Sequence, residues 1–333
     1  MRHTTNANTI KHRLGRLTPS STLVLSTLAL AASVAYAGNG HYEHDDDGLP
    51  AACSKTTRLA FKACRNDVRD DYYLQLGKCQ NESENDQRSS CVKEARTALE
   101  EGRQLCGEQR EARFEICDSI GEAAYDPQIN PADFLNPEQA AANPNPWFPL
   151  VPGMTRIYKA GEETITVTVT EDTREILGVT TIAVSDLVAI DGVSVEDTID
   201  WYAQDIYGNV WYFGEIAQNF EDGILTDLDG SWTAGVDNAK PGILMKAAPQ
   251  VGDIYRQEFL LGEAEDMAEV LDVNGSESAP GASCTGDCVV TRDFLPLEPD
   301  AVEYKYFAPG IGNIVTIDVD TGDREELVEF IQP

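Results

Sequence analysis

Aromatic, amide and carboxylate side chains are concentrated between Trp201 and Glu215, where the chain reads WYAQDIYGNVWYFGE. Aromatic rings can stack on flat ligands, and neighbouring polar groups can fix their orientation. The segment therefore predicts a ligand-binding hairpin with five candidate residues: Trp201, Tyr202, Gln204, Trp211 and Phe213. The same alternation also suits the aromatic core of a sheet, with the carboxylates in solvent.

Carboxylates are the acid–base groups left to an enzyme, because all four histidines lie before residue 45. This excludes Ser–His and Cys–His catalysis, and His-ligated zinc, in the folded body. A glycan hydrolase or lyase would need two carboxylates facing each other across a cleft, one with a raised pKa. Asp205 and Glu215 are the main candidates. The wider set is Asp200, Asp205, Glu215, Glu258, Glu265 and Asp266.

Two acidic segments could hold a cation. His41 and His44 stand beside three aspartates, and imidazole with carboxylate suits divalent transition metals. Asp318 and Asp320 lie in a segment that resembles a shortened calcium loop but lacks the twelve-residue EF-hand spacing. A solvated linker and a plain β-turn account for these residues, so we expect no metal and no cofactor.

Six of the eight cysteines are spaced with mirror symmetry, because the gaps between them are 11, 15, 12, 15 and 11 residues. Two antiparallel helices that fold back at residues 81–86 would place each cysteine opposite a partner on one face. The predicted pairs are Cys53 with Cys117, Cys64 with Cys106, and Cys79 with Cys91. Cys284 and Cys288 would form a fourth, local bridge.

The elements that position these residues follow from composition. Residues 51–124 lack proline and are rich in helix formers, which predicts a disulfide-stapled helical hairpin with a structural or docking role. Gly77 and Gly107 are expected to ease the approach of its helices, and its apolar stripe is expected to include Tyr73 and Leu74. The proline-rich linker at residues 125–153 should pack along the next domain as a strap through Trp147 and Phe148.

Residues 154–333 change to a period of two, which is typical of half-buried strands. Candidate strands are Thr164–Thr170, Ile176–Ile190, Val193–Ala203, Val210–Ile216, Tyr255–Leu261, Val289–Leu295, Val302–Ala308 and Ile314–Val319, and a short helix is possible at Ala264–Asp272. Turns are expected at Asp191-Gly192, Gly208-Asn209, Asp222-Gly223, Asp229-Gly230 and Thr321-Gly322. The fold class is therefore α+β: the helical hairpin, then a mostly antiparallel β domain forming a curled sheet, half-barrel or barrel.

The N-terminus predicts export. Residues 1–37 have a basic start, an uncharged apolar stretch and Ala35-Tyr36-Ala37, which is the order of a signal peptide. Residues 38–50 form a polar acidic and histidine-containing tail that we expect to be disordered. The rest of the chain holds no apolar stretch long enough to span a membrane. Eight cysteines suit an oxidising compartment, so we expect a secreted or periplasmic protein.

After residue 37 the chain carries 21 basic and 57 acidic residues, a net charge of −36. Such an acidic protein repels nucleic acid and anionic lipid, so neither is an expected partner.

The motifs WYAQD, NVWYFGE and GSWTAGVDNAKPGILM resemble an uncharacterised family of secreted bacterial proteins, over about residues 150–330. The resemblance implies a bacterial envelope or extracellular origin and no established activity.

Three functions are compatible with these residues. The favoured one is a non-enzymatic binding or cell-envelope protein whose ligand or protein partner is unknown. The alternatives are a carboxylate-dependent glycan hydrolase or lyase, and a structural protein whose hairpin mediates assembly.

Overall fold

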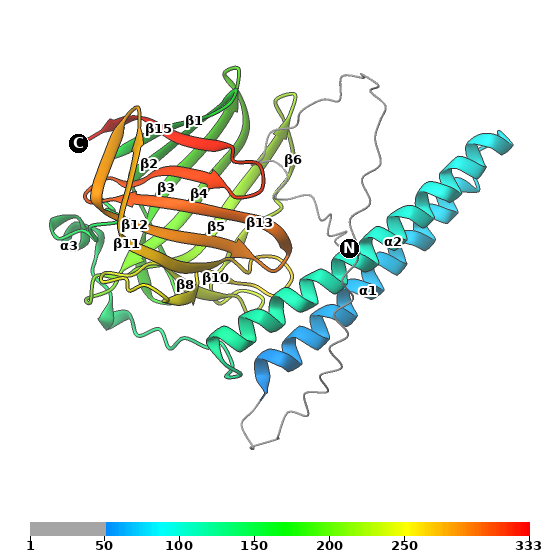
Figure 1. Ribbon diagram of the computed structural model, residues 1–333, viewed down its shortest axis with the longest axis horizontal. Coiled ribbons are helices and arrows are strands. Elements are labelled where there is room, and N and C mark those ends of the chain that lie inside the picture. The colour runs from blue at the N-terminus through cyan, green and yellow to red at the C-terminus, as the bar shows by residue number, and fades with distance from the viewer. Residues whose placement is uncertain (1–50) are drawn as a thin grey trace, which may run out of the picture. The chain divides into compact units, whose positions relative to one another are not determined.

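The computed structural model describes residues 51–333 (Figure 1), which form one unit of the chain. The predicted signal peptide and the tail with His41 and His44 lie outside the described residues. Two long helices come first, and a proline-rich segment leads from them into a large antiparallel sheet. No helix within residues 51–333 is long and apolar enough to cross a membrane.

Two antiparallel helices, α1 (Ala52–Cys79) and α2 (Asn85–Ile120), form the hairpin (Figure 1). The three predicted disulfides are confirmed: Cys53–Cys117, Cys64–Cys106 and Cys79–Cys91 have Cα–Cα distances of 5.7, 5.8 and 5.6 Å. These distances lie within the range that unstrained bridges require. Cysteine spacing alone therefore encoded the register of the two helices.

Small side chains let the two helices approach each other. The side chains of Ser54, Thr57, Ala60 and Ala95 are buried. Gly102 faces Val68 so closely that a Cβ atom there would lie 2.8 Å from Val68 Cγ1. The expectation for Gly77 and Gly107 was wrong, since a Cβ atom at either would meet nothing within 4 Å.

The predicted apolar stripe is also wrong at two positions. Tyr73 and Leu74 are 57% and 52% exposed. They precede Cys79 by six and five residues, which places them about 240° and 140° around the helix from the cysteine face. Both side chains are therefore left in solvent on the distal part of α1.

The linker packs on the sheet as the predicted strap. It contains η1 (Pro131–Asp133) and α3 (Pro137–Ala142), which begins with a capping box formed by Asn136 and Gln139. Trp147 and Phe148 pack against the main hydrophobic core. Asn145 is 1% exposed, and its Oδ1 accepts hydrogen bonds from the backbone N–H groups of both aromatic residues, which fixes the bend of the strap.

Fifteen strands, all paired antiparallel, make up the sheet, and their bounds are β1 (Thr155–Ala160), β2 (Glu163–Ile176), β3 (Val179–Ile190), β4 (Val193–Gln204), β5 (Val210–Glu221), β6 (Ile224–Asp227), β7 (Trp232–Thr233), β8 (Lys240–Met245), β9 (Ile254–Arg256), β10 (Glu258–Phe259), β11 (Met267–Ala279), β12 (Ala282–Leu295), β13 (Glu298–Ala308), β14 (Gly312–Asp318) and β15 (Arg324–Ile331). The spatial order is β10-β8-β5-β4-β3-β2-β1-β15-β14-β13-β12-β11-β9, with β6 and β7 paired to β5. The fold class is therefore confirmed as a stapled helical hairpin followed by an antiparallel β domain.

The sheet is not closed, although its two ends meet in one short segment. β9 pairs with β11, β10 pairs with β8, and only Gln257 separates β9 from β10 along the chain. β8 crosses this point at Gly242, where a Cβ atom would lie 2.4 Å from the carbonyl group of Gln257. Only glycine fits there, because any larger residue would force the two backbones apart.

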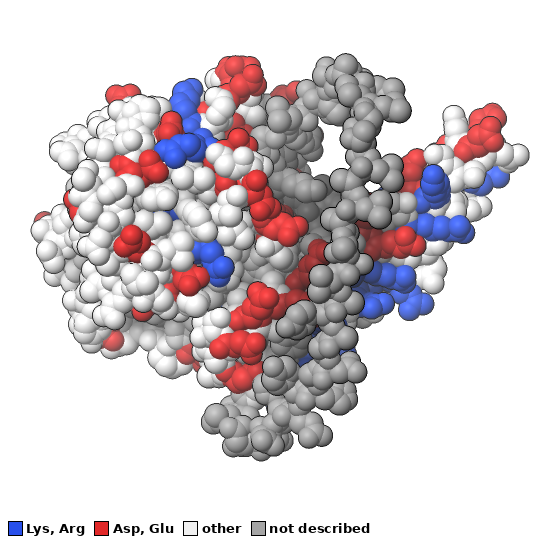
Figure 2. Space-filling view, viewed as in Figure 1, with Lys and Arg blue, Asp and Glu red and all other residues white. Residues whose placement is uncertain are grey.

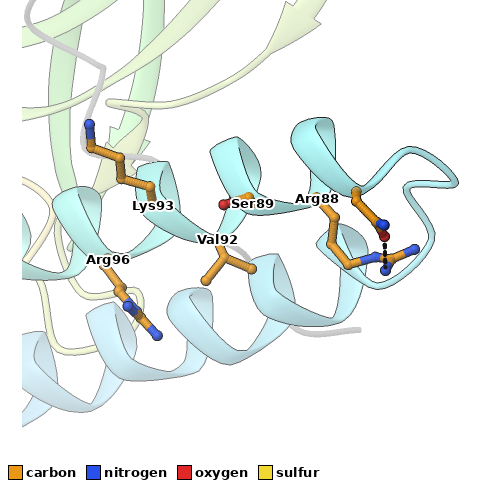
Figure 3. Close-up of a pocket in the computed structure, with 6 residues that line it drawn as sticks. Arg88, Ser89, Val92, Lys93 and Arg96 are labelled. Atoms are coloured by element: carbon orange, nitrogen blue, oxygen red, sulfur yellow. Dashed lines mark hydrogen bonds between the residues drawn. The ribbon is translucent and has the colours of Figure 1, made fainter.

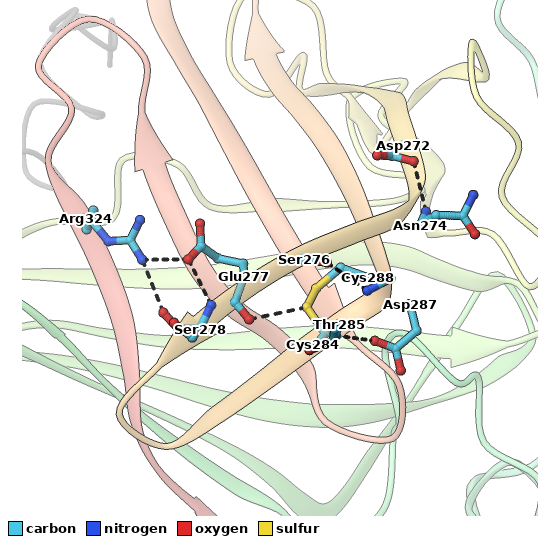
Figure 4. Close-up of a disulfide and its surroundings, with 11 residues drawn as sticks. Asp272, Asn274, Ser276, Glu277, Ser278, Cys284, Thr285, Asp287, Cys288 and Arg324 are labelled. Atoms are coloured by element: carbon cyan, nitrogen blue, oxygen red, sulfur yellow. Dashed lines mark hydrogen bonds and ion pairs between the residues drawn. A yellow bond between two sulfur atoms is a disulfide. The ribbon is translucent and has the colours of Figure 1, made fainter.

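Two clusters of buried side chains fill the interior of the curled sheet. The larger lies among β2–β5, β8, β9, β11 and β12 and includes Leu150 of the strap. The smaller includes Cys284 and Cys288, whose disulfide is confirmed, together with Leu327 of β15. The β11–β12 hairpin folds over β15, where Gly281 N–H donates to Leu327 O at 2.7 Å and Arg324 pairs with Glu277 (Figure 4).

The helix that was possible at residues 264–272 does not form, because β11 begins at Met267 and pairs with β12. Its Ala, Glu, Met and Leu residues favour a helix, yet burial of Met267 and Val270 between neighbouring strands decides the conformation. The predicted strand at 176–190 is divided by a turn at Leu177 and Gly178, with φ of 52° and 80°. The predicted turns at Asp191-Gly192 and Asp222-Gly223 are confirmed.

Candidate functional site

Three aromatic residues of the β4–β5 hairpin, Tyr202, Trp211 and Phe213, contact aromatic side chains of the strap. Tyr202, which is 7% exposed, stacks on Tyr212 with ring centroids 4.7 Å apart. Phe148 of the strap meets Tyr202 edge-on at 5.3 Å. Phe134, also of the strap, lies edge-on to Trp211 and to the fully buried Phe213. The predicted ligand-binding residues Tyr202, Trp211 and Phe213 therefore contribute to the packing of the strap on the sheet.

The side chains of Gln204 and Asp205 form hydrogen bonds, Gln204 with the backbone of the strap and Asp205 with the β4–β5 turn. The Gln204 side chain accepts from Asn145 N–H and donates to Asn143 O, both at 2.9 Å. Asp205 accepts four hydrogen bonds: two from backbone N–H groups of the turn, one from the Asn209 amide and one from Trp211 Nε1. A carboxylate with four donors at 2.8–2.9 Å is fully engaged by the turn that it organises.

The space between the strap and strands β3 and β4 is small. A cavity of about 10 Å³ lies there, with Leu150, Ile182, Tyr202 and Gln204 in its lining. That volume holds about one water molecule. A ligand that contacts Tyr202 or Gln204 would have to displace the strap. Trp201 is half-buried and lies under the Arg174 guanidinium at 5.5 Å.

Four of the candidate carboxylates interact inside the sheet. Asp200 and Glu215 are register partners on β4 and β5, and Tyr212 Oη donates to Asp200 Oδ1 at 2.5 Å. Burial raises the pKa of Glu258 well above its usual value, and the neighbouring Asp266, then Glu215, raise it further. A hydrogen bond from the Trp232 side chain acts in the opposite direction and lowers the pKa of Glu258 only in part.

This carboxylate cluster, defined as Asp200, Glu215, Glu258 and Asp266, matches one requirement of a glycan hydrolase, an acid with a raised pKa. Access is the other requirement, and Glu258 and Asp200 are only 6% and 8% exposed. Glu258 and Asp200 are therefore too deeply buried to contact a polymeric substrate.

Glu265 has a different role from the other candidates. It pairs with Arg113 of α2 at 2.6 Å, and their side chains are 1% and 6% exposed. Gln109, one turn earlier on α2, donates to Leu297 O at 2.8 Å. These two contacts fasten the base of the hairpin beside the segment where the ends of the sheet meet.

The predicted cation residues of the sheet form a turn. Asp318 Oδ1 accepts from the Thr321 N–H and hydroxyl groups at 2.7 and 2.9 Å, and Asp320 is exposed. Within residues 51–333, no three His, Cys, Asp or Glu side chains are grouped so that they could hold a metal ion.

No protein-family model matches the chain, and no curated protein or solved structure matches it. The resemblance to a secreted bacterial family stays a prediction, and function has to be inferred from the side chains themselves.

A basic hollow on α2, which we call the α2 groove, was not predicted. It is lined by Asn85, Arg88, Ser89, Val92, Lys93 and Arg96, and its volume is about 420 Å³ (Figure 3). Its residues lie in the first turns of α2, beside the loop that joins the two helices.

The cations of the α2 groove differ in how they are held. Arg88 donates to Asn85 Oδ1 at 3.2 Å and to Glu82 O at 2.7 Å, so its guanidinium is fixed against the loop. Lys93 and Arg96 are exposed, and within the described part of the chain neither forms an ion pair. The groove therefore offers two uncompensated cations beside a fixed one.

The distribution of charge along the chain makes this feature unusual. Residues 51–124 carry 12 basic and 14 acidic residues, whereas residues 125–333 carry 9 basic and 39 acidic ones. Lys and Arg side chains alternate with Asp and Glu along the helices, whereas Asp and Glu outnumber Lys and Arg on the visible face of the sheet (Figure 2). Positions 88, 92 and 96 have helical spacing, which could have indicated a shared face. The strongly negative net charge of the whole chain gave no indication of this local basic surface.

Proposed function

We propose that the protein is a secreted or periplasmic, non-enzymatic binding protein that uses the α2 groove to bind anionic groups. The observation that carries this proposal is the placement of the uncompensated Lys93 and Arg96 beside Arg88 on an otherwise acidic protein. Four disulfides favour an oxidising compartment outside the cytoplasm.

The hairpin supports the proposal through its rigidity and reach. Arg96 precedes Gln109, the nearer of the two anchor residues on α2, by 13 residues, or about 20 Å along the helix axis. The Cys79–Cys91 bridge lies within the groove region, next to Val92. A surface held by a covalent bridge loses little conformational freedom when a partner binds, which favours affinity.

The test is a titration of the chain from residue 38 with dextran sulfate, followed by calorimetry at about 50 mM salt, with uncharged dextran as a second probe. We expect the Lys93→Gln/Arg96→Gln variant to bind dextran sulfate about tenfold more weakly, a loss of about 1.4 kcal/mol. Binding should also fall with added salt, because exposed charges are screened.

The matched control is Lys55→Gln/Lys62→Gln, which removes the same charge from exposed positions on α1. An equal loss in this variant would mean that overall charge, and not the groove, attracts the probe. Retention of full affinity by the groove variant would overturn the proposal.

A second candidate function is glycan hydrolysis, favoured by one observation, the raised pKa of Glu258 among three other carboxylates. Release of reducing ends from soluble polysaccharides would test it. On this alternative, the unaltered chain releases reducing ends and a folded Glu258→Gln variant does not. No release by the unaltered chain would overturn it.

A further inference from the structure

The β5–β6 hairpin presents apolar side chains to solvent. β6 pairs only with β5, and all four of its residues are exposed. Ile224, Leu225 and Leu228 are 69%, 48% and 50% exposed. Exposed edge strands are usually charged, short or covered, and apolar groups on them mark contact surfaces. We call this surface the β6 edge.

Carboxylates flank the apolar residues of the β6 edge. Glu221, Asp222 and Asp227 are exposed, and the stretch from 175 to 239 contains no Lys or Arg. A partner for this edge must therefore bring both positive charge and apolar surface.

The α2 groove brings the positive charge, because Arg88, Lys93 and Arg96 line it and no Asp or Glu does. Residues that face each other across the disulfide register have numbers that sum to 170, as in Cys79–Cys91 and Cys64–Cys106. Arg96 of the α2 groove therefore lies at the same level along the hairpin as Leu74. Leu74 follows the exposed Tyr73 on α1. This end of the hairpin thus carries the cations of the groove and exposed apolar side chains, together with the exposed Asp70, Asp71 and Glu94.

We infer that the anionic partner of the α2 groove is the β6 edge of a second copy of this chain, an inference that rests on the proposed function. Lys93 and Arg96 would meet Glu221, Asp222 and Asp227, while Tyr73 and Leu74 would cover Ile224 and Leu225. Two different surfaces take part, so a pair of copies keeps one groove and one edge unused. Such head-to-tail contacts produce rings or open chains and not simple symmetric pairs.

The test measures mass in solution by sedimentation of the chain from residue 38, over about 1–500 µM and at two salt concentrations. We expect the average mass to rise with concentration at about 50 mM salt and to fall back toward the monomer at about 500 mM salt. A monomer at every concentration would overturn the inference.

Two variants and their mixture identify the surfaces. The groove variant is Lys93→Gln/Arg96→Gln, and the edge variant is Glu221→Gln/Asp222→Asn. Each should remain monomeric by itself. Their equimolar mixture should form pairs and nothing larger, because the intact groove of one binds the intact edge of the other. Association of either variant alone, or no association of the mixture, would contradict the assigned surfaces.

The control for the edge variant is Glu162→Gln/Asp191→Asn, which removes the same charge at two other exposed hairpin turns. It should associate like the unaltered chain. If that chain binds dextran sulfate but stays monomeric, this inference fails and the proposed function stands. If it neither binds dextran sulfate nor associates, both fail.

Discussion

At the scale of single residues, the candidate carboxylates separate into three environments. Asp205 is saturated by donors in a turn, Glu265 is neutralised by Arg113, and Glu258 lies buried among other acids. Composition cannot distinguish these environments, because all three residues are simply Asp or Glu in the sequence. Their difference arises from which donors the fold brings to each oxygen.

The raised pKa of Glu258 predicts a stability that depends on pH. The folded chain binds this proton more tightly than the unfolded chain does, so its contribution is fully present below the unfolded pKa of about 4.3. It is lost as the pH rises through the folded pKa. Replacement by glutamine removes the ionisation, and we expect Glu258→Gln to be more stable than the unaltered chain at pH 7–8.

Urea unfolding at a series of pH values would measure this effect. The two chains should differ least near pH 4, with a gap that widens as the pH rises. A gap that does not change with pH would mean that Glu258 ionises in the folded chain as easily as in solvent.

At the scale of elements, the helical hairpin depends on its bridges. Its interior consists mostly of small side chains and cystines, so little apolar surface is buried between the helices. We expect Cys64→Ser/Cys106→Ser to lower the opening free energy of α1 and α2 by about 2–4 kcal/mol. Hydrogen exchange at backbone amides would show this decrease in the helices but not in the core strands of the sheet.

A matched variant is Cys284→Ser/Cys288→Ser, which should leave the helices unchanged and weaken the β11–β12 hairpin. Equal losses in both regions for either variant would show that the hairpin and the sheet unfold together.

Cysteine spacing predicted the hairpin well because the residue numbers of the cysteines determine which positions of the two helices can face each other. The sheet was less predictable. Strands such as Val193–Ala203 alternate visibly, whereas β11 has a helical composition and becomes a strand only through its neighbours. The α2 groove was missed because basic residues on one helix face resemble any solvated surface until the loop and the ion pairs around them are known.

At the scale of the whole molecule, the ion pair between Arg113 and Glu265 joins the hairpin to the sheet. Both charges are buried, so removing one leaves the other without a partner. We expect Arg113→Met to cost about 3–5 kcal/mol. Urea unfolding should also show that Glu265→Gln in the same chain recovers part of this loss, since glutamine carries no charge and can still accept from Gly262 N–H.

Lys240→Met is the comparison for that prediction, because it breaks an exposed pair with Asp126. It should change stability little. A similar cost for both variants would mean that burial of the Arg113 pair is not what makes it important.

The nesting of the three bridges also sets an order of assembly. The separations between bridged cysteines are 12, 42 and 64 residues, and each closed loop lies inside the next. Closing the innermost pair brings the next two cysteines nearer, so oxidation can proceed from the loop toward the helix ends. All six cysteines precede Glu265 in the chain. The hairpin can therefore be locked covalently through cysteines that all precede the residue that anchors it to the sheet.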